Sequence, residues 1–72
     1  MTFHGTLAEL QDLLHNLEVT CHWEHMGPFE MAVIDDGVSN LRLHWWPATG
    51  DLQLTGEPAQ REPLLTRLQA AL

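Results

Sequence analysis

The fold is decided by a segment that reads Leu43-His44-Trp45-Trp46-Pro47-Ala48-Thr49-Gly50-Asp51-Leu52-Gln53-Leu54. Its centre is a turn, because Pro47 suits the first corner of a type I turn and Gly50 can take the positive φ that follows. Large apolar side chains recur at every second position on both sides of this turn, which is typical of strands that bury one face. We therefore predict a β-hairpin in which Trp45 lies in the core and Trp46 on the opposite face.

Two earlier segments have the same two-residue period. The first runs from Val19 to Glu24 and is interrupted by Met26-Gly27-Pro28, and the second begins at Phe29 and ends at the turn signal Asp35-Asp36-Gly37. Gly, Pro and Asp-Gly are strong signals for turns between strands. The next run leads directly into the hairpin. The sequence thus predicts four short strands, or three if the first is too short to pair.

Amphipathic helices are predicted at both ends of the chain. Near the N-terminus, Thr6 and Glu9 form the Thr-x-x-Glu pattern of a capping box. Leucines follow at helical spacing at positions 7, 10, 13, 14 and 17. A second helix is predicted near the C-terminus. Because Pro63 is tolerated only in a first turn, this helix should begin between Ala59 and Glu62.

These elements predict one α+β domain over residues 1–72, in the order helix, strands, helix. Short connections between consecutive strands favour an antiparallel meander, and the two amphipathic helices would both cover one face of the sheet. A chain of 72 residues has room for one core. The other face of the sheet would then remain open to solvent.

The charge of the chain is strongly acidic. Ten Asp and Glu residues against three Arg and no Lys give a net charge of −7. Binding of nucleic acid depends on Lys and Arg that neutralise phosphates, and anionic membranes attract the same residues. We therefore expect no direct contact with nucleic acid or membranes. One alternative is an inhibitor or regulator from a phage or mobile element, whose acidic surface blocks a nucleic-acid-binding enzyme.

Five histidines make a small His-based metal-binding domain a second alternative. His22 and His25 have the His-x-x-His spacing, but on a strand they would point to opposite faces. His22, Glu24 and His44 could meet on the open face only if their strands were neighbours, whereas a meander places another strand between them. We therefore expect neither a metal nor a cofactor.

Cys21 is the single cysteine, so no internal disulfide can form. Because neighbours in a strand face away from each other, His22 is badly placed to act as its base. Cys21 also lies between Val19 and Trp23 on the apolar face, which favours a buried structural thiol. With no other catalytic pattern in the sequence, we expect that the protein is not an enzyme.

The open sheet face is the candidate interaction surface. A Trp among polar residues and Arg is typical of the centre of a protein interface. Strand alternation assigns to this face Thr20, His22, Glu24, Ala32, Ile34, Arg42, His44 and Trp46. The residues predicted to bind a partner are Trp46, His44, Arg42, Ile34, His22 and Glu24.

Together these features predict a small, acidic, non-enzymatic protein-binding module. It would act through the open sheet face, either on a protein partner or on a second copy of itself in a homodimer. Residues 1–5 lack the basic and apolar regions of a signal peptide, so the expected location is the cytoplasm. The chain has three Arg and no Lys, a composition that suits a GC-rich bacterial or phage genome.

Overall fold

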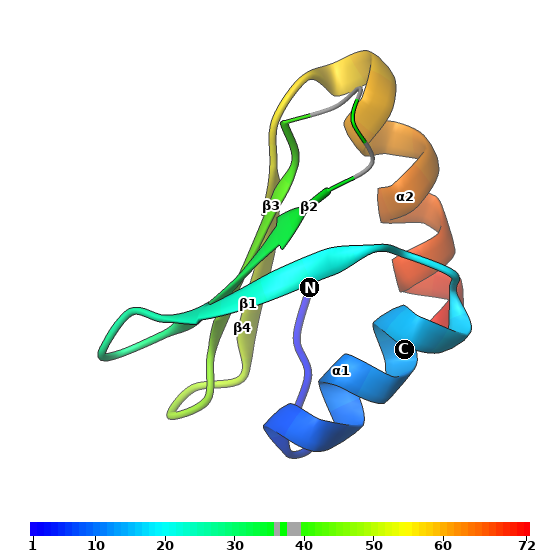
Figure 1. Ribbon diagram of the computed structural model, residues 1–72. Helices are drawn as coiled ribbons and strands as arrows, with labels where there is room; N and C mark the ends of the chain where they lie inside the picture. Colours follow the sequence, from blue (N-terminus) through cyan, green and yellow to red (C-terminus); the bar gives the residue numbers. More distant parts are fainter. Residues whose placement is uncertain (36, 38–39) are drawn as a thin grey trace.

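In the computed structural model, an antiparallel sheet stands in chain order between an N-terminal and a C-terminal helix. The elements are α1 (Leu7–Asn16), β1 (Cys21–His25), β2 (Glu30–Ile34), β3 (Arg42–Trp46), β4 (Asp51–Thr55) and α2 (Pro58–Ala71). The strands lie in the order β1-β2-β3-β4, so each pairs with the next. Both helices lie on the same side of the sheet (Figure 1). The predicted α+β meander is thereby confirmed.

The structure describes residues 1–35, 37 and 40–72. The turn predicted at Asp35-Asp36-Gly37 includes Asp36, which lies outside the described residues. The strand before this turn, β2, ends at Ile34. The segment that follows enters β3 at Arg42.

The first helix begins with the capping box that the sequence predicts. Thr6 Oγ1 accepts a hydrogen bond from the backbone N–H of Glu9 at 3.1 Å, and Glu9 Oε1 accepts one from the N–H of Thr6 at 2.9 Å. These bonds satisfy two donors that have no partner within the helix. A cap of this kind contributes about 1 kcal/mol. Two side chains therefore specify where α1 begins.

The first helix ends in a Schellman-type arrangement with Glu18 in the left-handed conformation, at a φ of 60°. The N–H of Glu18 donates to the carbonyl of His15 at 3.0 Å, and the N–H of Val19 donates to the carbonyl of Leu14 at 3.1 Å. Both bonds satisfy carbonyls that the last turn of the helix leaves free. The chain then reverses directly into β1.

The core lies between the helices and the inner face of the sheet. Leu10 and Leu14 of α1 and Leu64 and Leu68 of α2 are buried against it. Each fully buried leucine contributes roughly 1.5–3 kcal/mol through the area removed from water. From the sheet and the segment before β3, the buried side chains are Ala32, Ile34, Leu41, Leu43, Trp45, Leu52 and Leu54.

Trp45 ties the N-terminal segment to this core. Its side chain is 3% exposed, and its indole N–H donates to the carbonyl of Phe3 at 2.9 Å. The same segment lies along β4, where the N–H of Phe3 donates to the carbonyl of Gly50 and the N–H of Leu52 to that of Met1. Trp45 is therefore in the core as predicted, with its polar atom satisfied.

The face assigned to β2 from the sequence is wrong. Ala32 and Ile34 were expected on the open face, but both are buried in the core. The register pairs Trp23 with Ala32 and Cys21 with Ile34, and directly opposite residues share a face. All residues from Met31 to Ile34 are apolar, so their alternation could not fix which of them face inward. Ile34 therefore does not belong to the open face.

The second helix also begins earlier than predicted. Its first residue is Pro58, where the missing N–H removes no helical hydrogen bond, and Pro63 lies inside the helix. Pro63 cannot bond the carbonyl of Ala59, but both residues are exposed, so water can satisfy that carbonyl. With 14 residues α2 is the longer helix, and no helix in the described parts of the chain is long and apolar enough to cross a membrane.

We predict that Glu18→Gly stabilises the protein. The left-handed conformation costs a non-glycine residue roughly 1–2 kcal/mol, and glycine avoids this cost while giving the unfolded chain more freedom. The expected net gain in the free energy of unfolding is about 0.5–1 kcal/mol, measured by chemical denaturation. Glu18→Ala is the matched control, because it removes the same side chain but keeps Cβ. The idea fails if the glycine variant is no more stable than the alanine variant.

We also predict opposite results for the two neighbouring tryptophans. Trp45→Ala should lower the free energy of unfolding by roughly 3–5 kcal/mol, because it empties a buried site in a small core. Trp46→Ala should leave the domain folded, because that side chain lies on the other face. Thermal and chemical unfolding of both variants would check this. A greater loss from Trp46→Ala would mean that the register of β3 is shifted by one residue.

Candidate functional site

The face of the sheet turned away from the helices, here termed the outer face, presents its side chains in rows across the strands. One row consists of Glu24, Met31, His44 and Gln53, each directly opposite the next. A second row consists of His22, Val33, Arg42 and Thr55. A third contains Phe29, Trp46 and Asp51. Strand pairing thus brings together residues from distant parts of the sequence.

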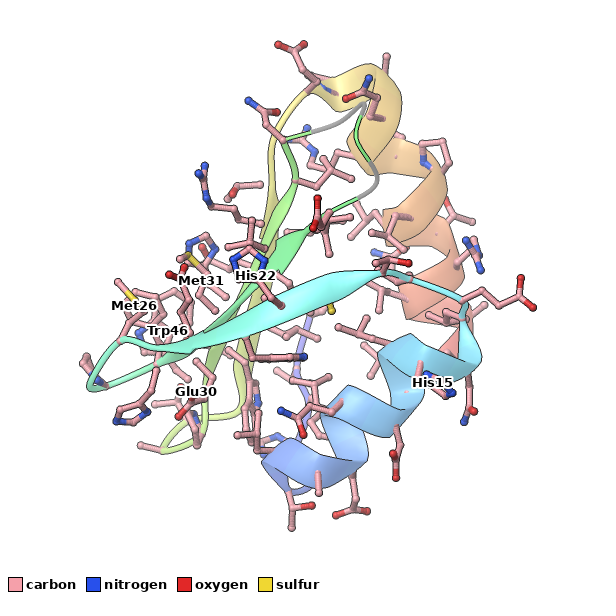
Figure 2. All side chains as sticks on the ribbon, in the orientation of Figure 1. His15, His22, Met26, Glu30, Met31 and Trp46 are labelled. Carbon is pink, nitrogen blue, oxygen red and sulfur yellow. The ribbon has the colours of Figure 1, made fainter. Side chains whose placement is uncertain are left out.

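Aromatic and aliphatic side chains occupy the middle of the outer face. The ring of Phe29 lies 5.0 Å from that of Trp46 and 5.5 Å from that of His44. The rings of His44 and Trp46 are 6.0 Å apart and stacked at 22°. Figure 2 shows Met31 and Trp46 on the side of the sheet away from the helices. We term Phe29, Met31, Val33, His44 and Trp46 the outer-face cluster; all are half-buried.

Polar side chains flank this cluster on both sides. On the β1 side they are His22 and Glu24, which are exposed. On the β3 and β4 side the exposed residues are Arg42, Asp51, Gln53 and Thr55. An apolar centre with a polar margin is the usual composition of a protein interface.

The structure places most of the predicted partner-binding residues on the outer face. His44, Trp46 and Arg42 extend from β3, and His22 and Glu24 extend from β1. Ile34 lies in the core instead, as described above.

Sequence reasoning missed the contribution to this face of Met31 and Val33 on β2 and of Phe29 directly before it. The turn at Gly27-Pro28 was the available signal. A two-residue turn there pairs Met26 with Phe29, and counting back along both strands pairs Glu24 with Met31. The positive φ of Gly27, 79°, fits such a turn.

A separate polar pair lies at the end of the β1–β2 hairpin. His25 Nδ1 is 2.5 Å from Glu30 Oε1. The His25 side chain is 72% exposed, whereas that of Glu30 is 14% exposed. Because solvent screens a pair with one exposed member, its contribution to stability is small. The pair joins the two strand ends beside the turn.

The histidines and carboxylates of the outer face remain apart. Val33 and Met31 of β2 lie between the β1 residues His22 and Glu24 and the β3 residue His44. Within residues 1–35, 37 and 40–72, no group of three or more His, Cys, Asp and Glu residues could hold a metal ion.

Cys21 is half-buried on the inner face, beside the core. Burial raises the pKa of its thiol above the ordinary value, while a hydrogen bond with the Trp23 side chain acts in the opposite direction. His22 points to the outer face, so it cannot deprotonate this thiol. A thiol that stays protonated is a weak nucleophile.

A shallow hollow of about 260 Å³ lies between α2 and the start of β1. Ligand pockets usually enclose about 300–1,000 Å³. The apolar lining of this hollow includes Val19, Ile34, Leu41 and Leu64. The guanidinium of Arg67 at its margin already donates to the carbonyl of Leu17. The outer-face cluster is therefore a stronger candidate for a binding site than this hollow.

Comparison with protein-family models, curated proteins and solved structures finds no match to this chain.

We predict that Cys21 reacts slowly with an alkylating reagent in the native protein. Only the thiolate reacts, and burial raises the pKa of this thiol, so less thiolate is present at a given pH than in the unfolded chain. The labelling rate of the native protein should rise with pH through a higher midpoint than that of the urea-unfolded protein. Mass spectrometry of quenched samples gives both rates. Equal rates in the two states would contradict the prediction.

Proposed function

We propose that this chain is a small, non-enzymatic protein-binding module that contacts a partner protein through the outer-face cluster. The observation that supports this most directly is the group of rings formed by Phe29, His44 and Trp46, within 6.0 Å of one another and half-exposed on a face that neither helix covers. Such a group exposes more apolar and aromatic area than an isolated apolar residue on a protein surface does.

The energetics of binding support the same role. Large aromatic side chains bury much area with few rotatable bonds, and they dominate the affinity of protein interfaces. Here the Trp46 ring already packs against Phe29 and His44, so little side-chain freedom remains to be lost on binding. The exposed polar side chains that flank the cluster, on β1 on one side and on β3 and β4 on the other, would supply hydrogen bonds that orient the partner.

The chemistry of the cluster favours binding over catalysis. Four of its residues, Phe29, Met31, Val33 and Trp46, have no group that could transfer a proton, and His44 stacks on an aromatic ring. Cys21 lies on the opposite face with a raised pKa. The proposed setting is the cytoplasm, where such a free thiol stays reduced.

Salt dependence separates this proposal from the inhibitor alternative. A partner attracted by the net charge of −7 would dissociate as ionic strength rises, because salt screens exposed charges. A partner held by the outer-face cluster would remain bound, because apolar contacts are not weakened by screening.

We predict that Trp46→Ala abolishes partner binding without unfolding the protein. Removing a central aromatic residue typically weakens an interface by at least about 2 kcal/mol, or roughly thirtyfold. Immobilised wild type and variant would be compared for proteins retained from a lysate of the source organism at low and high salt. Leu72→Ala is the matched control, because Leu72 is also an exposed apolar residue, at 44%, but lies after α2. The proposal fails if the same proteins are retained by Trp46→Ala.

A further inference from the structure

The two edges of the sheet differ in what lies beside them. At the β4 edge, Thr2 bridges to Asp51, and the N-terminal segment forms further backbone hydrogen bonds with Gly50 and Leu52. At the other edge lies β1, which pairs only with β2 in the described sheet (Figure 1). The β1 edge is therefore free to pair with another strand.

Strand geometry identifies the backbone groups that this edge presents. The carbonyl of Thr20 accepts from Asp35, and the N–H of Met26 donates to Phe29, so even-numbered residues of β1 bond to β2. Groups alternate in direction along an antiparallel strand. The N–H and C=O groups of Cys21, Trp23 and His25 consequently point away from β2. None of these residues takes part in the other backbone hydrogen bonds of the described chain.

We propose that β1 pairs antiparallel with β1 of a second copy, about a two-fold axis at Trp23. In this register Trp23 lies opposite Trp23 of the second copy, and Cys21 lies opposite His25. The outward N–H and C=O groups of both strands then form one continuous ladder. Two four-stranded sheets would become a single sheet of twice the width, in line with the self-complementary interfaces that two-fold symmetry requires.

Complementary polar side chains favour a second copy over an unrelated strand. The same register places His22 opposite Glu24 of the second copy, and Glu24 opposite His22, on the outer face. An imidazole thus faces a carboxylate on each side of the axis. The imidazole N–H can donate a hydrogen bond to that carboxylate, whereas two carboxylates directly opposite each other would repel. Within the strand Cys21–His25, His22 lies opposite Glu24 only in the antiparallel register that places Trp23 opposite Trp23.

The composition of β1 supports the same conclusion. Exposed edge strands are usually protected by Lys, Pro or a bulge, and β1 contains neither Lys nor Pro and pairs with β2 in an unbroken register. Its inner-face residues Cys21 and Trp23 are only half-buried, so a second strand would cover apolar area that the single domain leaves exposed. Within β1, Glu24 is the one carboxylate, so the net charge of −7 opposes this contact only at longer range.

Charge reversal tests the proposed register. His22→Glu should raise the dimer dissociation constant about tenfold, because it creates two Glu–Glu contacts. Adding Glu24→His in the same chain should restore wild-type affinity by exchanging the members of each pair. Gln53→Glu is the matched control, because it adds the same charge on the outer face of β4, away from the axis. Sedimentation velocity over a range of concentrations gives the dissociation constants.

Amide hydrogen exchange tests the backbone ladder. The N–H groups of Cys21, Trp23 and His25 should exchange quickly in dilute protein and slowly at high concentration. Those of His22 and Glu24 should be protected at both concentrations because they bond to β2.

A protein that is monomeric at every concentration overturns the proposal. So does a dimer that His22→Glu leaves intact, or one that Trp46→Ala dissociates, since the contact would then lie on the outer face. The dimer contact shares His22 and Glu24 with the margin of the outer face but does not include the outer-face cluster. Because the measurements report only self-association, the proposed function can fail or hold independently of them.

Discussion

Neighbouring residues of a β-strand point to opposite faces, and this constraint acts on the two large side chains Trp45 and Trp46 of β3. Trp45 points inward, where its indole N–H finds the carbonyl of Phe3 and its ring fills the core. Residue 46 must then point outward in any sequence with this fold. Folding does not require that residue to be Trp, and here its ring meets Phe29 and His44. The side chains stacked around position 46 are the basis of the proposal that this face contacts a partner protein.

Most of the architecture could be predicted because local signals agree with one another. The capping box at Thr6 and Glu9 specifies the start of α1, and the turn from Pro47 to Gly50 fixes the β3–β4 hairpin. The start of α2 could not be predicted from Pro63. A proline inside a helix both removes a hydrogen bond and crowds the carbonyl four residues before it. At the exposed position of Pro63 water can supply the missing partner, which lowers the first of these two costs.

The outer face could be predicted only in part, for a reason that concerns β2. On β1 and β3, histidine, arginine and glutamate alternate with apolar residues, so each face is distinct in the sequence. On β2, residues 31–34 are all apolar, so its two faces look alike until a neighbouring strand sets the register. Sequence alternation therefore placed Ile34 on the open face with Trp46, although Ile34 is buried in the core. Strand pairing instead surrounds Trp46 with Phe29 and His44.

The pairing of the N-terminal segment with β4 has a consequence for the rate of folding. Each strand of the meander pairs with its neighbour in sequence, so these contacts form by closing short loops. The contact between Thr2 and Asp51 is different, because it closes a loop of about two thirds of the chain before the Trp45 indole can reach the Phe3 carbonyl. We expect the hairpins to form early and the N-terminal segment to dock late. The barrier to folding would then reflect this one distant closure more than the assembly of the sheet.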